Sequence, residues 1–156
     1  LGNGHYDFSG GLEMPKGHYV ASVREKDRDA MREGIVVTET PVALEVRVRA
    51  DGGSMEGKVI DARGRASQDA VVVLMPLGLL ETRTDRQDTY RVQRSTQTGA
   101  FEVSGIIPGE YLIYAWSNVN EATMMDPWFM ERYKGRGLPV KVEPNAKLKM
   151  DVTLLD

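Results

Sequence analysis

Polar and apolar residues alternate along several stretches of the chain, most regularly in residues 42–49 and 146–155. In the first stretch the apolar positions are Val42, Leu44, Val46 and Val48, and the polar positions between them include Glu45, Arg47 and Arg49. A period of two places each set on its own face of a strand. The pattern therefore predicts half-buried strands of an antiparallel sheet.

The most strongly patterned region is residues 99–116, where two runs rich in β-branched and aromatic residues are joined by Pro108 and Gly109. Such runs, bounded by turn residues, predict a β-hairpin. Residues 4–23 carry a second copy of this pattern. The match continues downstream, with 34–37 resembling 137–140 and 42–49 resembling 146–155. The order of elements therefore predicts a repeated unit.

The repeat predicts how the chain is divided. Asp51-Gly52-Gly53-Ser54 interrupts the alternation with residues that favour irregular backbone, so we place a boundary there. Residues 1–50 would be the C-terminal part, about four strands, of a preceding repeat, and 54–156 a complete domain. The chain starts without Met and directly before a strand, so we expect it to be a mature form or a piece of a longer protein.

Further runs supply the remaining elements of the complete domain. Residues 57–61 and 88–93 predict strands, and 70–75 is a continuous apolar run that Pro76 ends. A run of this kind predicts a strand covered on both faces. Residues 27–33 are helix-compatible but short and without an apolar face, so we expect a loop with at most one helical turn.

The strand expected at 110–116 is apolar on both sides. Tyr111, Ile113 and Ala115 alternate with Leu112, Tyr114 and Trp116. One face can enter a sandwich core, but the other needs a cover, because large exposed apolar patches are uncommon on soluble monomers. The nearest cover is a short helix beginning at Asp126 as N-cap, with Pro127 in its first turn, and ending at 134–137.

One set of motifs resembles a known family. The motifs are Gly57-x-Val59-x-Asp61-x-x-Gly64, then Ala70-x-Val72, then Gly99-x-Phe101-x-Val103-x-Gly105-Ile106-x-Pro108-Gly109-x-Tyr111. They resemble the carboxypeptidase regulatory-like domain, a transthyretin-like β-sandwich. The resemblance implies an all-β, seven-stranded antiparallel Greek-key sandwich, with Gly64 and Gly109 in turns that need positive φ. It also implies tandem copies in a large periplasmic, cell-surface or secreted protein.

Composition and charge remove several classes of function. The net charge of −3 and the mixed-sign clusters argue against nucleic acid and membrane insertion, and no apolar run approaches the length of a membrane helix. Cysteine is absent, and the only histidines, His5 and His18, lie outside the complete domain. The acidic residues show no spacing typical of acid/base catalysis or of a calcium loop. We therefore expect no enzyme activity, no cofactor and no metal.

Two functions remain open. The first is a non-catalytic module that acts as a spacer, a folding aid or a protein-interaction unit. The second is carbohydrate binding by rings and amides near the expected helix, for which the candidate residues are Trp116, Trp128, Tyr133 and Asn118. Two coplanar rings open to water would favour the second function. Full burial would exclude it.

The incomplete first repeat leads to a separate expectation about partners. A sandwich that lacks its first strands leaves hydrogen-bonding edges unpaired, and such edges recruit other strands. We expect residues 3–49 to pair with another copy, to pack on the complete domain, or to have been accompanied by strands that this piece of the chain lacks. The expected partners are neighbouring domains of the parent protein or another copy of the chain.

Overall fold

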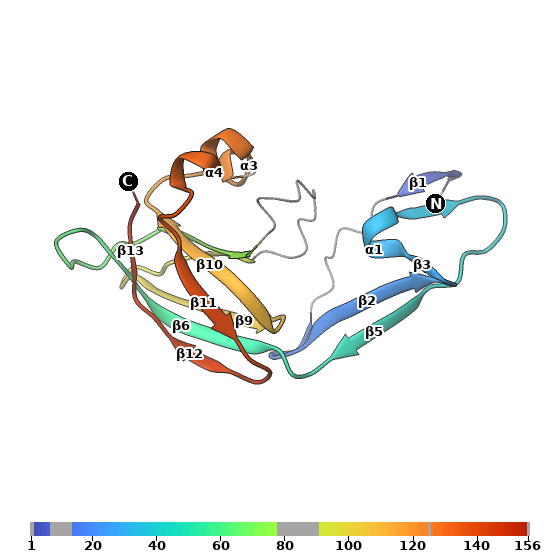
Figure 1. The fold of residues 1–156 in the computed structure, drawn as a ribbon, viewed down its shortest axis with the longest axis horizontal. Coiled ribbons are helices and arrows are strands. Elements are labelled where there is room, and N and C mark those ends of the chain that lie inside the picture. The colour runs from blue at the N-terminus through green and yellow to red at the C-terminus, as the bar shows by residue number, and fades with distance from the viewer. Residues whose placement is uncertain (1, 7–13, 78–90, 125, 156) are drawn as a thin grey trace.

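A computed structural model describes residues 2–6, 14–77, 91–124 and 126–155. The described chain consists mainly of strands, with three short helices, and it divides into a sandwich and an N-terminal part (Figure 1). The all-β fold class expected from the alternation is confirmed. Part of the strand predicted at 88–93 lies outside the described residues.

The sandwich contains two sheets that are built from residues 53–153. One has the order β11-β10-β7-β8 and consists of β11 (Leu138–Val142), β10 (Gly109–Trp116), β7 (Val71–Pro76) and β8 (Arg91–Arg94). The other places β6 (Gly53–Ile60) between β9 (Ala100–Ile106) and an interrupted last strand, β12 (Lys147–Lys149) and β13 (Val152–Thr153). The expected seven strands are thus present if β12 and β13 count as one.

The last strand departs from the expected antiparallel pattern, since β12 and β13 run parallel to β6. The reason is the connection that leads into β12. The Asn145 amide donates to the Asp51 carbonyl at 2.8 Å, and the Ser54 amide donates to the Ala146 carbonyl at 2.8 Å. Because the chain returns to the sheet that contains β6 beside the start of β6, its last strand runs in the same direction as β6.

Strand β7 is buried on both faces, as its continuous apolar sequence predicts. Val72 and Leu74 enter the core between the sheets, while Val71, Val73 and Met75 enter a second apolar cluster on the outer side. That cluster is covered by α3 (Glu121–Met124) and α4 (Pro127–Tyr133) (Figure 1). The predicted helical cover is therefore confirmed.

The two glycines expected to have positive φ in turns, Gly64 and Gly109, differ in outcome. Gly64 has φ +75°, as expected for its turn. Gly109 does not have positive φ, so that prediction was wrong, and the left-handed residue of this region is Gly105, with φ +65°. The β-hairpin predicted over 99–116 is also wrong, because β9 pairs with β6 while β10 pairs with β7 and β11, so the two strands lie in different sheets. Residues 107–109 carry the chain from β9 in one sheet to β10 in the other without a left-handed residue.

The N-terminal part forms two small sheets. In one, β2 (Tyr19–Glu25) lies between β5 (Glu45–Arg49) and β3 (Arg28–Asp29), and in the other β1 (Gly4–Tyr6) pairs with β4 (Ile35–Val37). The single helical turn expected near 27–33 is α1 (Ala30–Glu33), which begins at the N-cap Asp29.

These pairings differ from those of the sandwich. If the segments were equivalent copies, β2 would correspond to β10 and β4 to β11, which pair with each other in the sandwich. Instead, β2 pairs with β5. The described strands therefore do not confirm the tandem repeat. Where an N-terminal strand has a counterpart in the sandwich, the two strands pair with different neighbours.

Candidate functional site

The aromatic residues predicted to bind a ligand are divided between the interior and the surface. Trp116, at the end of β10, is 1% exposed, whereas Trp128, in the first turn of α4, is 82% exposed. Tyr133 is half-buried and Asn118 is exposed. The structure thus brings Trp116 and Tyr133 together beneath the helix and leaves Trp128 on the outside.

The buried rings form one packed group. Trp116 stacks on Tyr114 with ring centroids 5.4 Å apart and planes 5° apart, and Tyr133 meets the edge of Trp116 at 5.3 Å. Among the described residues, neither Tyr114 Oη nor Trp116 Nε1 has a hydrogen-bond partner, and burial raises the pKa of Tyr114. The two coplanar rings are buried away from water, and they stabilise the outer cluster through the apolar surface that they bury.

Short-range caps hold the cover over these rings. The Asp126 Oδ1 atom accepts from the Trp128 amide at 2.9 Å, and the Asn120 Oδ1 atom accepts from the Thr123 amide at 2.8 Å. Asp126 is thus the N-cap that the sequence predicts. Asn120, next to the candidate Asn118, uses its side chain to begin α3 rather than to reach a ligand.

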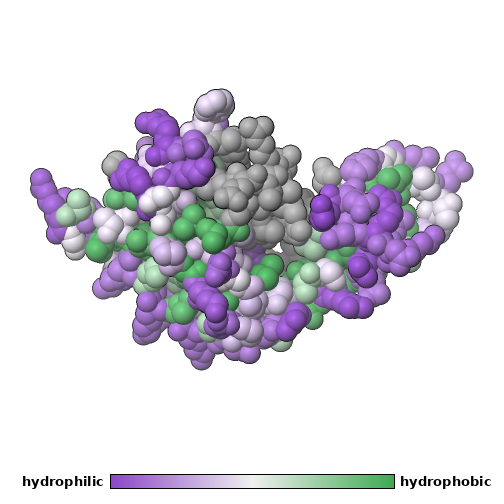
Figure 2. All heavy atoms as spheres, viewed as in Figure 1, coloured by the Kyte–Doolittle hydropathy of each residue, from purple (hydrophilic) through white to green (hydrophobic). Residues whose placement is uncertain are grey.

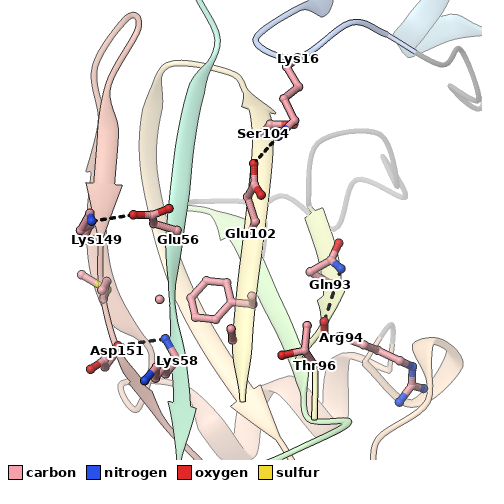
Figure 3. Close-up of a pocket in the computed structure, with 14 residues that line it drawn as sticks. Lys16, Glu56, Lys58, Gln93, Arg94, Thr96, Glu102, Ser104, Lys149 and Asp151 are labelled. Atoms are coloured by element: carbon pink, nitrogen blue, oxygen red, sulfur yellow. Dashed lines mark hydrogen bonds and ion pairs between the residues drawn. The ribbon is translucent and has the colours of Figure 1, made fainter. Parts of the chain in front are cut away.

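A shallow hollow of about 920 Å³ lies on the outer face of β6, β9 and β12. Opposite charges line it in pairs: Glu56 lies 2.8 Å from Lys149 Nζ, and Glu102 lies 2.8 Å from Lys16 Nζ (Figure 3). The ion pair lowers the pKa of Glu56 and raises that of Lys149. All four side chains are well exposed, so these pairs contribute little to stability. With Lys58, Arg94 and Asp151 included, the charged lining has four cations and three carboxylates, so the charges nearly balance and do not select a strongly charged ligand.

The N-terminal part and the sandwich meet at three glycines. The Gly52 amide donates to the Gly17 carbonyl at 2.9 Å. A Cβ atom on Gly52 would lie 2.7 Å from that carbonyl oxygen, and one on Gly105 would lie 2.6 Å from the His18 carbonyl oxygen. Backbone therefore touches backbone with no room for side chains. We call Gly17, Gly52 and Gly105 the glycine junction.

Polar contacts flank the glycine junction on two sides. Lys16 crosses to Glu102 of β9. Tyr19 of β2 contacts Asp51, and burial together with this hydrogen bond raises the pKa of Tyr19. Arg49 holds the pKa of Asp51 below its usual range. The sequence pattern identified Gly52 only as a boundary, and it gave no sign that Gly17, Lys16 and Gly105 would meet there.

Three of the large apolar side chains on the surface lie on or beside β5, the outer strand of the N-terminal sheet. Leu44, Val46 and Val48 are 38%, 42% and 48% exposed. On the face seen in Figure 2 the N-terminal part is mostly hydrophilic, and hydrophobic residues reach the surface in scattered places over the sandwich. Within the N-terminal part Val36 of β4 is also exposed, at 41%, so three of the four exposed large apolar side chains described there lie on or beside β5.

The two histidines and the turn carboxylate Asp61 contact backbone groups. No three His, Cys, Asp or Glu side chains among the described residues lie close enough to hold a metal. His5 Nε2 lies 2.9 Å from the Glu33 carbonyl oxygen and His18 Nδ1 lies 3.1 Å from that of Lys16, so each imidazole contacts backbone. Asp61 accepts from the Arg63 and Arg65 amides of its own turn. None of the helices described is long and apolar enough to cross a membrane.

The fold and these surfaces define a β-sandwich module with an attached pair of small sheets. No family model matches the chain and no curated protein matches it, so the resemblance to carboxypeptidase regulatory-like domains is not confirmed. Solved structures that are similar include a DUF3823 family protein from Bacteroides ovatus, with 16% identity and a TM-score of 0.41 over 65% of this chain and 44% of that one.

Two other similar structures come from different bacteria. A putative carbohydrate-binding protein from Pseudomonas aeruginosa has 17% identity and a TM-score of 0.40 over 66% of this chain and 88% of that one. The major pilin subunit of Bacillus cereus has 16% identity and a TM-score of 0.40 over 71% of this chain and 33% of that one. The chain thus spans less than half the length of the DUF3823 protein and of the pilin. Likenesses of this size say nothing about what the chain binds.

Proposed function

We propose that this chain is part of a larger multidomain envelope or secreted protein and that its sandwich is a non-catalytic spacer and protein-interaction module. In this proposal residues 54–156 are the complete domain and residues 1–50 are the end of the preceding one. The partners are then neighbouring domains of the parent protein, or another copy of the chain. The observation that carries the proposal is the glycine junction.

The glycine junction supports a spacer because it fixes how the two parts meet. Only residues 50–52 separate β5 from β6, and the Gly52 amide is held by the Gly17 carbonyl. Domain boundaries usually fall in flexible linkers where few contacts cross. Here the short connection and the direct backbone contact both restrict rotation. A module joined in this way keeps the distance and direction between its neighbours.

The junction makes a testable prediction about Gly105→Ala. The new Cβ atom would meet the His18 carbonyl oxygen at 2.6 Å, in addition to the cost of φ +65° in an L-residue. We expect the Gly52 amide, which donates across the junction, to exchange with deuterium about tenfold faster or more, since overpacking against backbone costs roughly 1–3 kcal/mol. Hydrogen exchange measured by NMR reads this amide directly.

Gly64→Ala is the matched control for Gly105→Ala. Gly64 has φ +75°, but a Cβ atom there meets nothing within 4 Å. This variant carries the same backbone cost without the contact, so it should lower overall stability while the Gly52 amide keeps its protection relative to the sandwich. Equal protection of Gly52 in the two variants would contradict a tightly packed junction, and with it the spacer proposal.

Carbohydrate binding is the second candidate, and the exposure of Trp128 favours it. A ring that is 82% exposed on a capped helix is available to stack on the C–H face of a sugar. Trp116, at 1% exposed, would not take part without movement of α4. Any such site therefore depends on Trp128, with Tyr133 and Asn118 as the other candidate residues, and not on the coplanar rings beneath the helix.

A fluorescence titration tests this candidate. If Trp128 binds sugars, chitohexaose or cellohexaose should change the tryptophan emission of the wild type and leave that of Trp128→Phe unchanged, because the remaining Trp116 is buried. A protein that responds to neither oligosaccharide, or a variant that responds as the wild type does, would count against Trp128 as a sugar platform.

A further inference from the structure

Strand β5 is the outer strand of the N-terminal sheet, and all five of its residues are exposed (Figure 1). Among the described residues it pairs only with β2, so one of its edges carries backbone N–H and C=O groups that no described strand satisfies. An exposed edge of this kind is a template for another strand. The sequence of the strand decides which partner fits it.

The two faces of β5 differ in chemistry. On one face lie Leu44, Val46 and Val48, and the last two stand opposite Val23 and Val20 of β2. Glu45 and Arg47 lie on the other face and contact each other at 2.7 Å. A strand added to this edge would therefore be stabilised by apolar residues on the first face and by opposite charges on the second.

We propose that the partner is a second copy of this chain, paired antiparallel through β5 with Val46 facing Val46 of the second copy across a two-fold axis. In that register Leu44 faces the second copy's Val48, so the apolar face is continued. Glu45 faces the second copy's Arg47, and by symmetry Arg47 faces the second copy's Glu45. The inference rests on the proposed function, because it gives the interaction module its partner.

Other antiparallel registers of the same strand do not match. Centring the pair on Arg47 sets Arg47 against Arg47, and centring it on Glu45 sets Glu45 against Glu45. Centring it on Val48 places Arg47 against Arg49. A slip by one residue would put the valines on the charged face. The register centred on Val46 is the one that matches both faces, and this complementarity favours a second copy over an unrelated strand.

Single cysteines test both the pairing and its register, since the chain has no cysteine of its own. Residues directly opposite each other have Cβ atoms about 4.5–5.5 Å apart, which is near the range for a disulfide, whereas residues four positions away along the strand are out of reach. Under mild oxidation Val46→Cys should therefore form a covalent dimer. Val48→Cys should not, because Val48 faces Leu44 of the second copy.

Val36→Cys is the control for random collision. Val36 lies on β4 and is 41% exposed, close to the 42% of Val46. Dimers formed equally by all three variants would show collision only and would overturn the inference. A dimer formed by Val48→Cys alone would overturn the register. A wild type that stays monomeric across a dilution series in sedimentation equilibrium would overturn the partner, and the strand that β5 accepts would then come from elsewhere in the parent protein.

A charge swap tests the face that carries Glu45 and Arg47. Arg47→Glu would set two carboxylates against each other at both symmetric positions, and Glu45→Lys would set two cations together. Each variant alone should dimerise about tenfold more weakly, because like charges opposite each other destabilise a pair of strands. An equimolar mixture of the two restores both opposite-charge contacts and should dimerise as the wild type does.

Failure of this inference is distinguishable from failure of the proposed function. Arg47 stands opposite Ser22 and Glu45 stands opposite Arg24, and each variant also breaks the exposed Glu45–Arg47 pair, so the fold of both variants is checked by circular dichroism. A mixture that associates no better than its components overturns the self-pairing. The protection of the Gly52 amide does not depend on β5 pairing, so it tests the spacer separately.

Discussion

Replacing Trp116 with alanine should reduce the free energy of unfolding by about 4 kcal/mol, whereas replacing Trp128 should change it by less than about 0.5 kcal/mol. Both residues are tryptophans, and they lie on opposite sides of the same helical cover. Urea denaturation followed by circular dichroism measures both values. The comparison separates a structural role for the aromatic group from a role at the surface.

The large effect at Trp116 follows from its contacts. Its ring stacks on Tyr114, meets Tyr133 edge-on and lies 5.4 Å from Phe129, and it is 1% exposed. Removing it leaves a cavity between β10 and α4 in addition to the lost burial of the ring. Trp128 has no comparable loss, because its ring is already largely in water.

Trp116→Phe refines the test. Trp116 Nε1 is buried without a hydrogen-bond partner among the described residues, and burying such a group without a partner is unfavourable. Phenylalanine keeps a ring and removes the N–H, so this variant should lose clearly less stability than alanine does. Similar losses for Trp116→Ala and Trp128→Ala would show that the rings do not form the cluster described here.

Local sequence was enough to predict the elements whose determinants are close together in the chain. The alternation at 146–155 identified the last strand, and the apolar run at 70–75 identified a strand covered on both faces. Asp126 and Pro127 predicted where α4 begins. Each of these depends on side-chain periodicity or on a cap within one turn, which a single sequence shows directly.

Long-range pairing was harder to predict, because it depends on residues far apart in the chain. The parallel direction of β12 is set where Asn145 meets Asp51, and the pairing of β2 with β5 is set by neighbours rather than by either strand's own pattern. The candidate ligand residues show the same limit. Trp116 and Trp128 are equivalent in a list of aromatics, and only the packing of α4 makes one interior and the other exposed.

Gly57→Ala should be the most damaging glycine substitution in the sandwich. A Cβ atom on Gly57 would lie 1.8 Å from the Met150 carbonyl oxygen and 2.7 Å from its carbonyl carbon. Both atoms belong to backbone, which cannot rotate away as a side chain can, so the segment between β12 and β13 must leave β6. We expect a loss of about 3 kcal/mol or more in urea denaturation, at or above the upper end of ordinary overpacking.

Gly109→Ala is the control for Gly57→Ala, because its Cβ atom would make an ordinary contact, 3.6 Å from Tyr111 Cε2. The Met150 amide donates to the Glu56 carbonyl at 3.0 Å, and the Lys58 amide donates to Asp151 at 2.9 Å. In Gly57→Ala both amides should lose protection from hydrogen exchange, while amides shared by β7 and β10 keep theirs relative to global unfolding. Unchanged protection of Met150 would show that the last strand is not seated against Gly57, and the parallel closure of the sandwich would have to be revised.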